Sequence, residues 1–296
     1  MKYILSIDGG GIRGCITSCA LVELEKQTGK LCRDIFSFVA GTSTGAMIAA
    51  AIAAGIPATT ILELYTMQCA KVFNHPPAVA LALRLARGWA YEPANLQRTL
   101  QSVLGAAANW TLNDSPIKIL LTAKGCNKAP LYFVPDNPKN ANLWGKQKLI
   151  DCTVASASAT TYFDAWPVPG VGPVYDGGLG VSGNPVHQAA VEAFYYDDYD
   201  RDTTRIISLG TGYTVDANTK PIGLPAELAW LLDALLTSPE GEQTGLVNRY
   251  YPGIMQRFDW QLESAIDMAD VAAIPGLVTL GKKVAAAMDW KTILAI

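Results

Sequence analysis

The chain has 296 residues, of which 50% are hydrophobic and 17% are charged, and its formal net charge is −3. This composition is typical of a globular protein with a large apolar core, and it predicts one α/β domain over residues 1–296. Because the chain has no long basic cluster, we expect no nucleic-acid partner.

The spacing of the cysteines bears on metal binding, and the length of the apolar stretches bears on localisation. No Cys-x-x-Cys pair or histidine pair completes a zinc set, so we expect no metal. The thiols are expected to be buried and free in a reducing compartment; they are Cys15, Cys19, Cys32, Cys69, Cys126 and Cys152. We expect a cytoplasmic protein, because Tyr3–Ile7 is too short for a signal peptide and no apolar stretch could span a bilayer.

Apolar periodicity in the first half of the chain predicts strands that alternate with helices. Strands are expected at 3–7, 35–40, 117–123 and 131–134, and helices at 15–26, 46–54, 60–73, 76–89 and 96–104.

The second half continues this alternation. After a polar loop at 137–146, helices are expected at 151–159, 184–195 and 275–288, and strands at 173–175, 205–209 and 255–260. The apolar run Leu224–Leu236 suits a buried or an interfacial helix. The alternation predicts an α/β sandwich with a largely parallel sheet.

The motif Gly41-Thr42-Ser43-Thr44-Gly45 joins a predicted buried strand to an alanine-rich helix. A serine in such a tight turn is lifted clear of the sheet at a helix N-terminus, and the following N–H can face an oxyanion. The same pattern also arises as a plain small-residue turn. Between these two elements, we interpret it as a nucleophile elbow.

A serine nucleophile needs a base, and the chain has only His75 and His187. His187 is predicted to lie within a helix close behind Asp176, whereas an α/β-hydrolase places its histidine in a loop after a late strand. Asp176-Gly177-Gly178 suits the base role better, because a carboxylate followed by two glycines can approach another loop closely. An Asp-Gly turn alone is common.

The glycine run Asp8 to Gly14 follows the first predicted strand and precedes the first predicted helix. Such a loop directs backbone N–H groups at an anion. Gly9-x-Gly11-x-x-Gly14 formally matches a dinucleotide fingerprint, but Asp34 stands before its strand and not after it. The run lacks the Gly-Lys-Ser/Thr of a phosphate-binding P-loop.

In this order, the three motifs resemble those of the patatin-like phospholipases, lipid acyl hydrolases with a Ser–Asp dyad and no histidine. Four further segments also fit, the last more loosely: Ala155–Phe163, Asn184–Pro185, Ser208–Gly212 and Gln256–Asp259. The resemblance implies a three-layer α/β/α sandwich around a mostly parallel mixed sheet. The region 76–113, where family members vary, is expected to shape the substrate groove.

The resemblance also assigns roles to residues. It implies that Ser43 is the nucleophile and Asp176 its base, with no cofactor. Backbone N–H groups of one loop would form the oxyanion hole, with the Arg13 side chain nearby; the loop comprises Gly9, Gly10, Gly11, Ile12, Arg13 and Gly14.

The expected function is hydrolysis of carboxylic esters of phospholipids or glycolipids through an acyl-enzyme, as by a phospholipase A or lysophospholipase. Transfer of the acyl group to another acceptor uses the same dyad and stays open, as does a lipase effector that is silent until an activator binds. The partner is expected to be a lipid. Apolar faces at 78–89 and 224–236 could give transient contact with a membrane surface, or could equally pack in the core.

Overall fold

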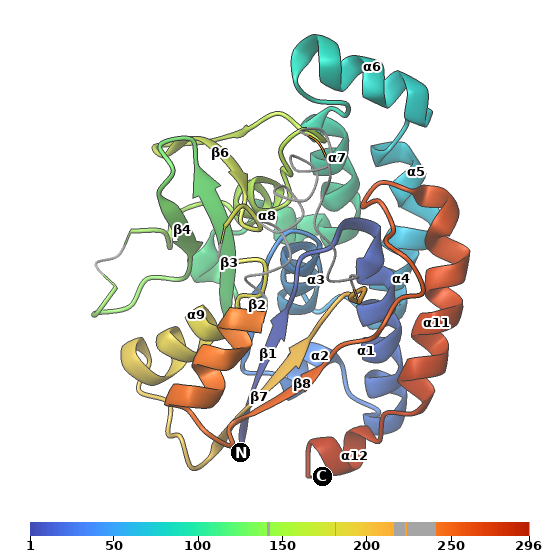
Figure 1. Ribbon diagram of the computed structural model, residues 1–296. Helices are drawn as coiled ribbons and strands as arrows, with labels where there is room; N and C mark the ends of the chain where they lie inside the picture. The colour runs from blue at the N-terminus through green and yellow to red at the C-terminus, as the bar shows by residue number, and fades with distance from the viewer. Residues whose placement is uncertain (141–142, 181, 216–222, 224–240, 296) are drawn as a thin grey trace.

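The computed structural model describes residues 1–140, 143–180, 182–215, 223 and 241–295. The described chain is built on one eight-stranded sheet with helices on both faces (Figure 1). The strands are β1 (Lys2–Ile7), β2 (Phe38–Gly41), β3 (Lys118–Gly125), β4 (Pro130–Phe133), β5 (Trp166–Val168), β6 (Gly172–Asp176), β7 (Thr204–Leu209) and β8 (Met255–Phe258).

The helices alternate with these strands along most of the chain. They are α1 (Gly14–Thr28), α2 (Cys32–Ile35), α3 (Thr44–Ala53), α4 (Ala58–Glu63), α5 (Cys69–Val72), α6 (Pro77–Arg87), α7 (Pro93–Leu104), α8 (Leu149–Ser156), α9 (Val186–Val191), α11 (Ile274–Ala286) and α12 (Trp290–Ile293). Residues 241–250 are also helical. Single π-helical segments, Leu64–Gln68 and Glu192–Tyr196, follow α4 and α9.

The strand order is β5-β6-β3-β2-β1-β7-β8, and β4 pairs with β3. The pairings of β1 with β2 and β7, of β2 with β3, and of β7 with β8 are parallel. The pairings of β3 with β4 and β6, and of β5 with β6, are antiparallel. The predicted mixed, mostly parallel sheet is therefore confirmed.

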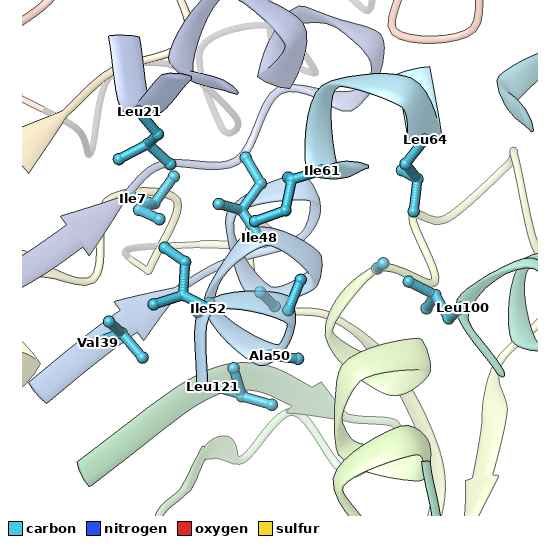
Figure 2. Packing of buried hydrophobic residues seen from close by; sticks show 14 of the residues in the cluster. Ile7, Leu21, Val39, Ile48, Ala50, Ile52, Ile61, Leu64, Leu100 and Leu121 are labelled. Carbon is cyan, nitrogen blue, oxygen red and sulfur yellow. The ribbon is translucent and has the colours of Figure 1, made fainter. Parts of the chain in front are cut away.

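Side chains of the central strands alternate between two apolar layers. In β1, Leu5 and Ile7 face the layer that holds α1, α3, α8 and α11, whereas Ile4 faces the layer that holds α9. Figure 2 shows the larger layer, where Ile48 and Ile52 of α3 pack against side chains of the sheet. Because both faces are covered, these strands are mostly apolar, which is why the sequence shows them as short apolar runs.

Three predictions from the sequence need correction. Residues 35–37 were expected to begin a strand, but a turn of α2 ends there, since the Phe36 N–H donates to the Cys32 carbonyl (3.0 Å). The short strand β5 was not predicted, because it has only three residues, its central residue is Pro167, and Pro169 follows it directly. Cys126 was expected to be buried and is exposed; the other five thiols are buried and all six are free.

The carboxyl ends of the parallel strands meet along one line of the sheet. Ile7 is in register with both Gly41 and Leu209, and Gly41 with Leu121. Asp176 joins them from β6, opposite Ala123. Because ligands bind at the carboxyl ends of parallel strands in α/β folds, the loops that follow these residues are where a site is expected.

The predicted helix at 224–236 lies outside the described residues. Within the residues that the structure describes, no helix has both the length and the hydropathy that crossing a bilayer requires.

Candidate active site

Ser43 occupies the turn between β2 and α3, at the N-cap of the helix. Its backbone has φ 56° and ψ −121°, a region that L-residues with a side chain rarely adopt. The Ser43 N–H donates to the Ser156 Oγ (3.0 Å), and the Ser43 carbonyl accepts from the N–H of Ala46 (2.9 Å). These bonds hold a strained turn of the kind that exposes a nucleophile.

The two glycines that flank this turn are required by close backbone contacts. A Cβ on Gly41 would lie 2.2 Å from the Gly45 carbonyl oxygen, and a Cβ on Gly45 would lie 2.2 Å from the Ile7 carbonyl oxygen. The threonines on either side of Ser43 are buried. Thr42 Oγ1 contacts Thr122 Oγ1 (2.7 Å), and Thr44 Oγ1 contacts the hydroxyl of Tyr65.

Asp176 lies at the end of β6, and its side chain is buried beside Ser43. Burial raises the pKa of Asp176 to about 6, while hydrogen bonds from Ser43 and from the Gly178 N–H (2.7 Å) oppose the shift. A Cβ on Gly177 would lie 2.6 Å from the Thr122 carbonyl oxygen, so only glycine lets this turn approach β3 so closely. The sequence motifs are thus brought together from distant parts of the chain.

The glycine loop after β1 runs beside this pair, and the Cβ of Ser43 lies 3.3 Å from where a Cβ on Gly9 would be. Four of its N–H groups already have carbonyl acceptors: those of Gly9, Ile12, Arg13 and Gly14. Among the residues that the structure describes, the N–H groups of Gly10 and Gly11 have no acceptor. Of the six predicted oxyanion-hole residues, these two present free donors.

Arg13 was expected near the oxyanion hole, and its guanidinium forms hydrogen bonds that hold the glycine loop in place. Its Nε donates to the Gly10 carbonyl and its Nη1 to the Gly212 carbonyl, each at 3.2 Å. The Thr211 hydroxyl adds a third tie by donating to the Gly9 carbonyl (2.6 Å). The segment after β7 therefore fixes the shape of the glycine loop.

Reasoning from the sequence did not find the ionic network beneath this loop. The Asp8 carboxylate is fully buried and accepts from both terminal nitrogens of Arg257, which also donates to Asp259 (2.7 Å). Burial raises the pKa of Asp8, and the Arg257 guanidinium opposes this shift. The only signal in the sequence was the loose likeness noted at Gln256–Asp259.

An apolar pocket of about 520 Å³, its mouth to solvent included, opens at Ser43. Leu96 and Thr99 of the predicted groove region 76–113 line it, but more of its wall comes from 64–73, which was not predicted to contribute. The lining residues are Gly11, Ile12, Ser43, Thr44, Met47, Leu64, Tyr65, Cys69, Val72, Phe73, Leu96, Thr99, Ala157, Ala159, Phe163 and Met268. A smaller apolar cavity of about 240 Å³ shares Met47, Leu64 and Tyr65 with it.

Neither histidine lines this pocket. His187 is half-buried in α9, whose apolar side chains pack in the smaller layer, and burial lowers its pKa. His75 stacks on the ring of Tyr91, with 5.9 Å between centroids. The described residues therefore bring Ser43 together with Asp176 and with no imidazole.

The model of one family, Patatin-like phospholipase, matches residues 5–190, more than half of the chain. This span includes the glycine loop, the Ser43 turn and Asp176. The chain belongs to the patatin-like phospholipase family. Its sheet, flanked by helices on both faces, confirms the fold that the resemblance implied.

Characterised relatives cover different shares of this patatin-like chain. A cGAMP-activated phospholipase of Vibrio cholerae is 33% identical over 207 residues, which are 64% of this chain and 57% of the relative. One from Escherichia coli is 28% identical over 223 residues, 70% of this chain and 61% of the relative. The rat 85/88 kDa calcium-independent phospholipase A2 is 29% identical over 240 residues, 71% of this chain and 27% of the relative.

The chain thus matches little more than half the length of the cGAMP-activated relatives. Among solved structures, VipD from Legionella pneumophila has a TM-score of 0.46 and 12% identity, and the match covers 97% of this chain and 66% of VipD.

Proposed function

We propose that this chain is a serine lipid acyl hydrolase that cleaves carboxylic ester bonds of phospholipids or glycolipids. One observation carries the proposal: Ser43, held on a strained turn at a helix N-terminus, is hydrogen-bonded to the buried carboxylate of Asp176 at an apolar pocket. Membership of a phospholipase family agrees with this chemistry.

In the first half-reaction, Ser43 Oγ attacks the ester carbonyl while Asp176 accepts the hydroxyl proton. The pKa of Asp176, raised to about 6, suits this role, because the carboxylate is ionised at neutral pH yet basic enough to take a proton. The lysolipid or alcohol leaves with the proton that Asp176 returns, and the acyl group stays on Ser43 as an ester.

The negative charge on the tetrahedral intermediate needs donors that are already in place. We assign this role to the N–H groups of Gly10 and Gly11, which have no acceptor among the described residues. The Thr44 N–H, at the first turn of α3, is a third candidate. Arg13 and Thr211 act by holding the loop in shape.

In the second half-reaction, water attacks the acyl-enzyme and gives its proton to Asp176. The carbonyl carbon passes through a second tetrahedral intermediate, held by the same N–H groups. Collapse of this intermediate releases the fatty acid and returns the proton to Ser43 Oγ. The cycle consumes one water and needs no cofactor.

The pocket favours an acyl chain as the group bound next to Ser43. Its wall is formed by Met47, Leu64, Val72, Phe73 and Phe163, with few polar atoms. An apolar pocket of this kind binds hydrocarbon through burial of area and has little with which to orient a polar group. The head group of the lipid would therefore lie outside it.

Product analysis tests the proposal directly. The protein is incubated with a phosphatidylcholine that carries different acyl chains at its two positions, and separately with a galactolipid, and the products are identified by mass spectrometry. We expect free fatty acid and lysolipid from the parent chain and neither from Ser43→Ala. Equal labelling of the parent and Ser43→Ala by a fluorophosphonate probe would refute the role of Ser43.

The names of the relatives favour one regulatory variant of this proposal. Three bacterial phospholipases that match are named for activation by cGAMP. We therefore include assays with and without cGAMP. Release of fatty acid only when cGAMP is present would identify an activator-dependent lipase, and a shift from fatty acid to acyl ester when an alcohol is added would identify a transferase.

A further inference from the structure

The outward face of α6 is entirely apolar. At 100° per residue, six residues of this helix share one arc and all of them are exposed: Ala78, Val79, Leu81, Ala82, Leu85 and Ala86. Leu85 is 80% exposed and Leu81 is 56% exposed, whereas Ala80 on the opposite side is buried. A surface helix of a globular protein normally has the reverse orientation, with its apolar face inward.

The two charged residues of α6, Arg84 and Arg87, lie off the outward arc and contact other residues of the protein. The Arg84 guanidinium lies over the ring of Tyr162, 4.0 Å from its centroid. Arg87 donates to the carbonyls of Trp89 and Ala90, each at 3.1 Å, and pairs with Glu92 at 2.8 Å. The helix is thus fastened by its cations, which leaves no charge on its outward arc.

The same contacts fix α6, at the top of the view in Figure 1, next to segments that line the Ser43 pocket. Phe73, which precedes the helix, lines the pocket and packs edge-on against Tyr91, which follows it (5.1 Å between centroids). Phe163, also in the pocket wall, packs near both rings. Tyr162, under Arg84, donates to Asp267, the neighbour of the pocket residue Met268.

We propose that the outward face of α6 docks the protein on a lipid bilayer, with Leu81 and Leu85 inserted among the acyl chains. The proposal rests on the proposed function, because it supplies the route by which a membrane lipid would reach the pocket. It predicts that docking needs no anionic lipid, since the outward arc of α6 has no cation.

A bilayer fits this face better than a protein partner does. Protein interfaces owe most of their binding energy to aromatic and arginine anchors surrounded by hydrogen-bonding groups, and this arc has neither. A hydrocarbon phase requires only apolar area, which leucine, valine and alanine provide. Phe73, four residues before α6, also lines the apolar pocket that is proposed to take an acyl chain from the same phase.

Flotation with neutral phosphatidylcholine vesicles tests the proposal. The Ser43→Ala chain is used as the parent so that the vesicles stay intact, and it is compared with the same chain carrying Leu81→Glu and Leu85→Glu. Leu143→Glu is the matched control, since Leu143 is 62% exposed and belongs neither to α6 nor to the pocket wall. We expect the α6 variant to bind at least about tenfold more weakly and the control to bind like the parent.

A second measurement keeps the test valid if the glutamates disturb folding. Leu85→Trp places a fluorophore on the face, and its emission is expected to shift to the blue when vesicles are added. Equal flotation of the parent and the α6 variant, or an unshifted tryptophan, overturns the proposal. So does a parent that is dimeric and does not float, together with an α6 variant that is monomeric, because a second copy then covers the face.

Failure of docking and failure of the proposed function give different results. With Ser43 intact, the α6 variant is expected to hydrolyse a water-soluble short-chain ester at the parent rate while losing activity on vesicles. If no ester is hydrolysed but flotation still depends on α6, the proposed function fails and docking stands. If vesicle lipids are hydrolysed equally by both chains, docking fails and the proposed function stands.

Discussion

Asp8 and Arg257 are 249 positions apart in the sequence and form a bidentate salt bridge, with 2.9 Å between Nη1 and Oδ1 and 2.5 Å between Nη2 and Oδ2. Arg257 also bonds Asp259, which accepts from the Gly212 N–H (2.9 Å). The end of β8 therefore supports two loops: the glycine loop beside Ser43, which begins at Asp8, and the loop that ends at Gly212 and holds the glycine loop.

Replacement of Arg257 by methionine is expected to be strongly destabilising. It would leave a buried carboxylate without its partner, which typically costs about 3–5 kcal/mol in the free energy of unfolding. Unfolding in urea measures this loss. Lys26→Met is the control, because Lys26 forms an ion pair with Glu23 on the surface, and such pairs contribute at most about 1 kcal/mol.

The double variant Asp8→Asn with Arg257→Met separates this cause from simple loss of packing. If the unpaired charge is responsible, the double variant is expected to recover a large part of the lost stability, because the fully buried charge of Asp8 is then absent. If the losses in free energy of unfolding of the two single variants simply added in the double variant, this explanation would be contradicted.

The pH dependence of hydrolysis should report the ionisation of Asp176. Only the carboxylate can accept the Ser43 proton, and its pKa is raised to about 6. We expect kcat/KM on a neutral, soluble ester to be constant above this pH and to fall about tenfold per pH unit below it. A profile that stays flat down to the usual pKa range of an aspartate would show that Asp176 is not the base.

Asp176→Asn should lower activity and raise stability under the same conditions. The variant cannot accept a proton, so we expect at least about a hundredfold loss of kcat. Because the folded-state pKa lies above the usual value of 3.8, ionised Asp176 destabilises the fold once the pH exceeds both values. The neutral amide is therefore expected to raise the melting temperature at pH 8 and not near pH 3; equal changes at both would point to another cause.

The sequence was most informative where a backbone turn requires a small residue or where a strand is buried on both faces. The order of elements and the positions of Ser43 and Asp176 were predictable, because tight turns and buried parallel strands impose local patterns. Family resemblance supplied the proposed joint role of the two residues, since 133 positions separate them and no local pattern relates them.

The remainder depended on tertiary contacts that leave no local pattern. Nothing near Gly10 and Gly11 in the sequence shows that their N–H groups find no acceptor among the described residues while the Ile12 N–H donates to the Met268 carbonyl (3.1 Å). The inward orientation of Arg84 was likewise unpredictable, because it depends on the ring of Tyr162, 78 positions away. An amphipathic pattern shows that a helix has two faces and does not show which of them faces the core.

Gly11→Ala should impair catalysis much more than Gly29→Ala does. Both glycines have a left-handed backbone, with φ of 59° and 67°, so both substitutions carry a similar backbone strain of about 1 kcal/mol. A Cβ at Gly29 meets nothing within 4 Å, but one at Gly11 would lie 2.4 Å from the Met268 carbonyl oxygen and would displace the loop.

Misplacement of one oxyanion donor typically lowers kcat about a hundred- to a thousandfold, and we expect a loss of this size for Gly11→Ala. Steady-state kinetics on a soluble ester and thermal melts of both variants separate the two effects. If both variants lost stability equally and kept full activity, the glycine loop would have no part in stabilising the oxyanion.

Leu64 lies between the Ser43 pocket and the smaller cavity behind it and contributes to the wall of both, as do Met47 and Tyr65. Figure 2 shows its side chain near that of Leu100, which lines the smaller cavity. Leu64→Ala would join the two spaces, and longer acyl chains would then gain apolar contacts that shorter ones cannot reach. We expect the ratio of kcat/KM for long-chain over short-chain soluble esters to rise about tenfold, the discrimination typical of one or two methylenes in an apolar pocket.

Val103→Ala is the control, because Val103 lines only the smaller cavity and its truncation leaves the partition in place. An unchanged ratio in Leu64→Ala would mean that the acyl chain leaves the pocket by another path, and a rise in both variants would mean that cavity size alone, and not the Leu64 partition, sets the limit.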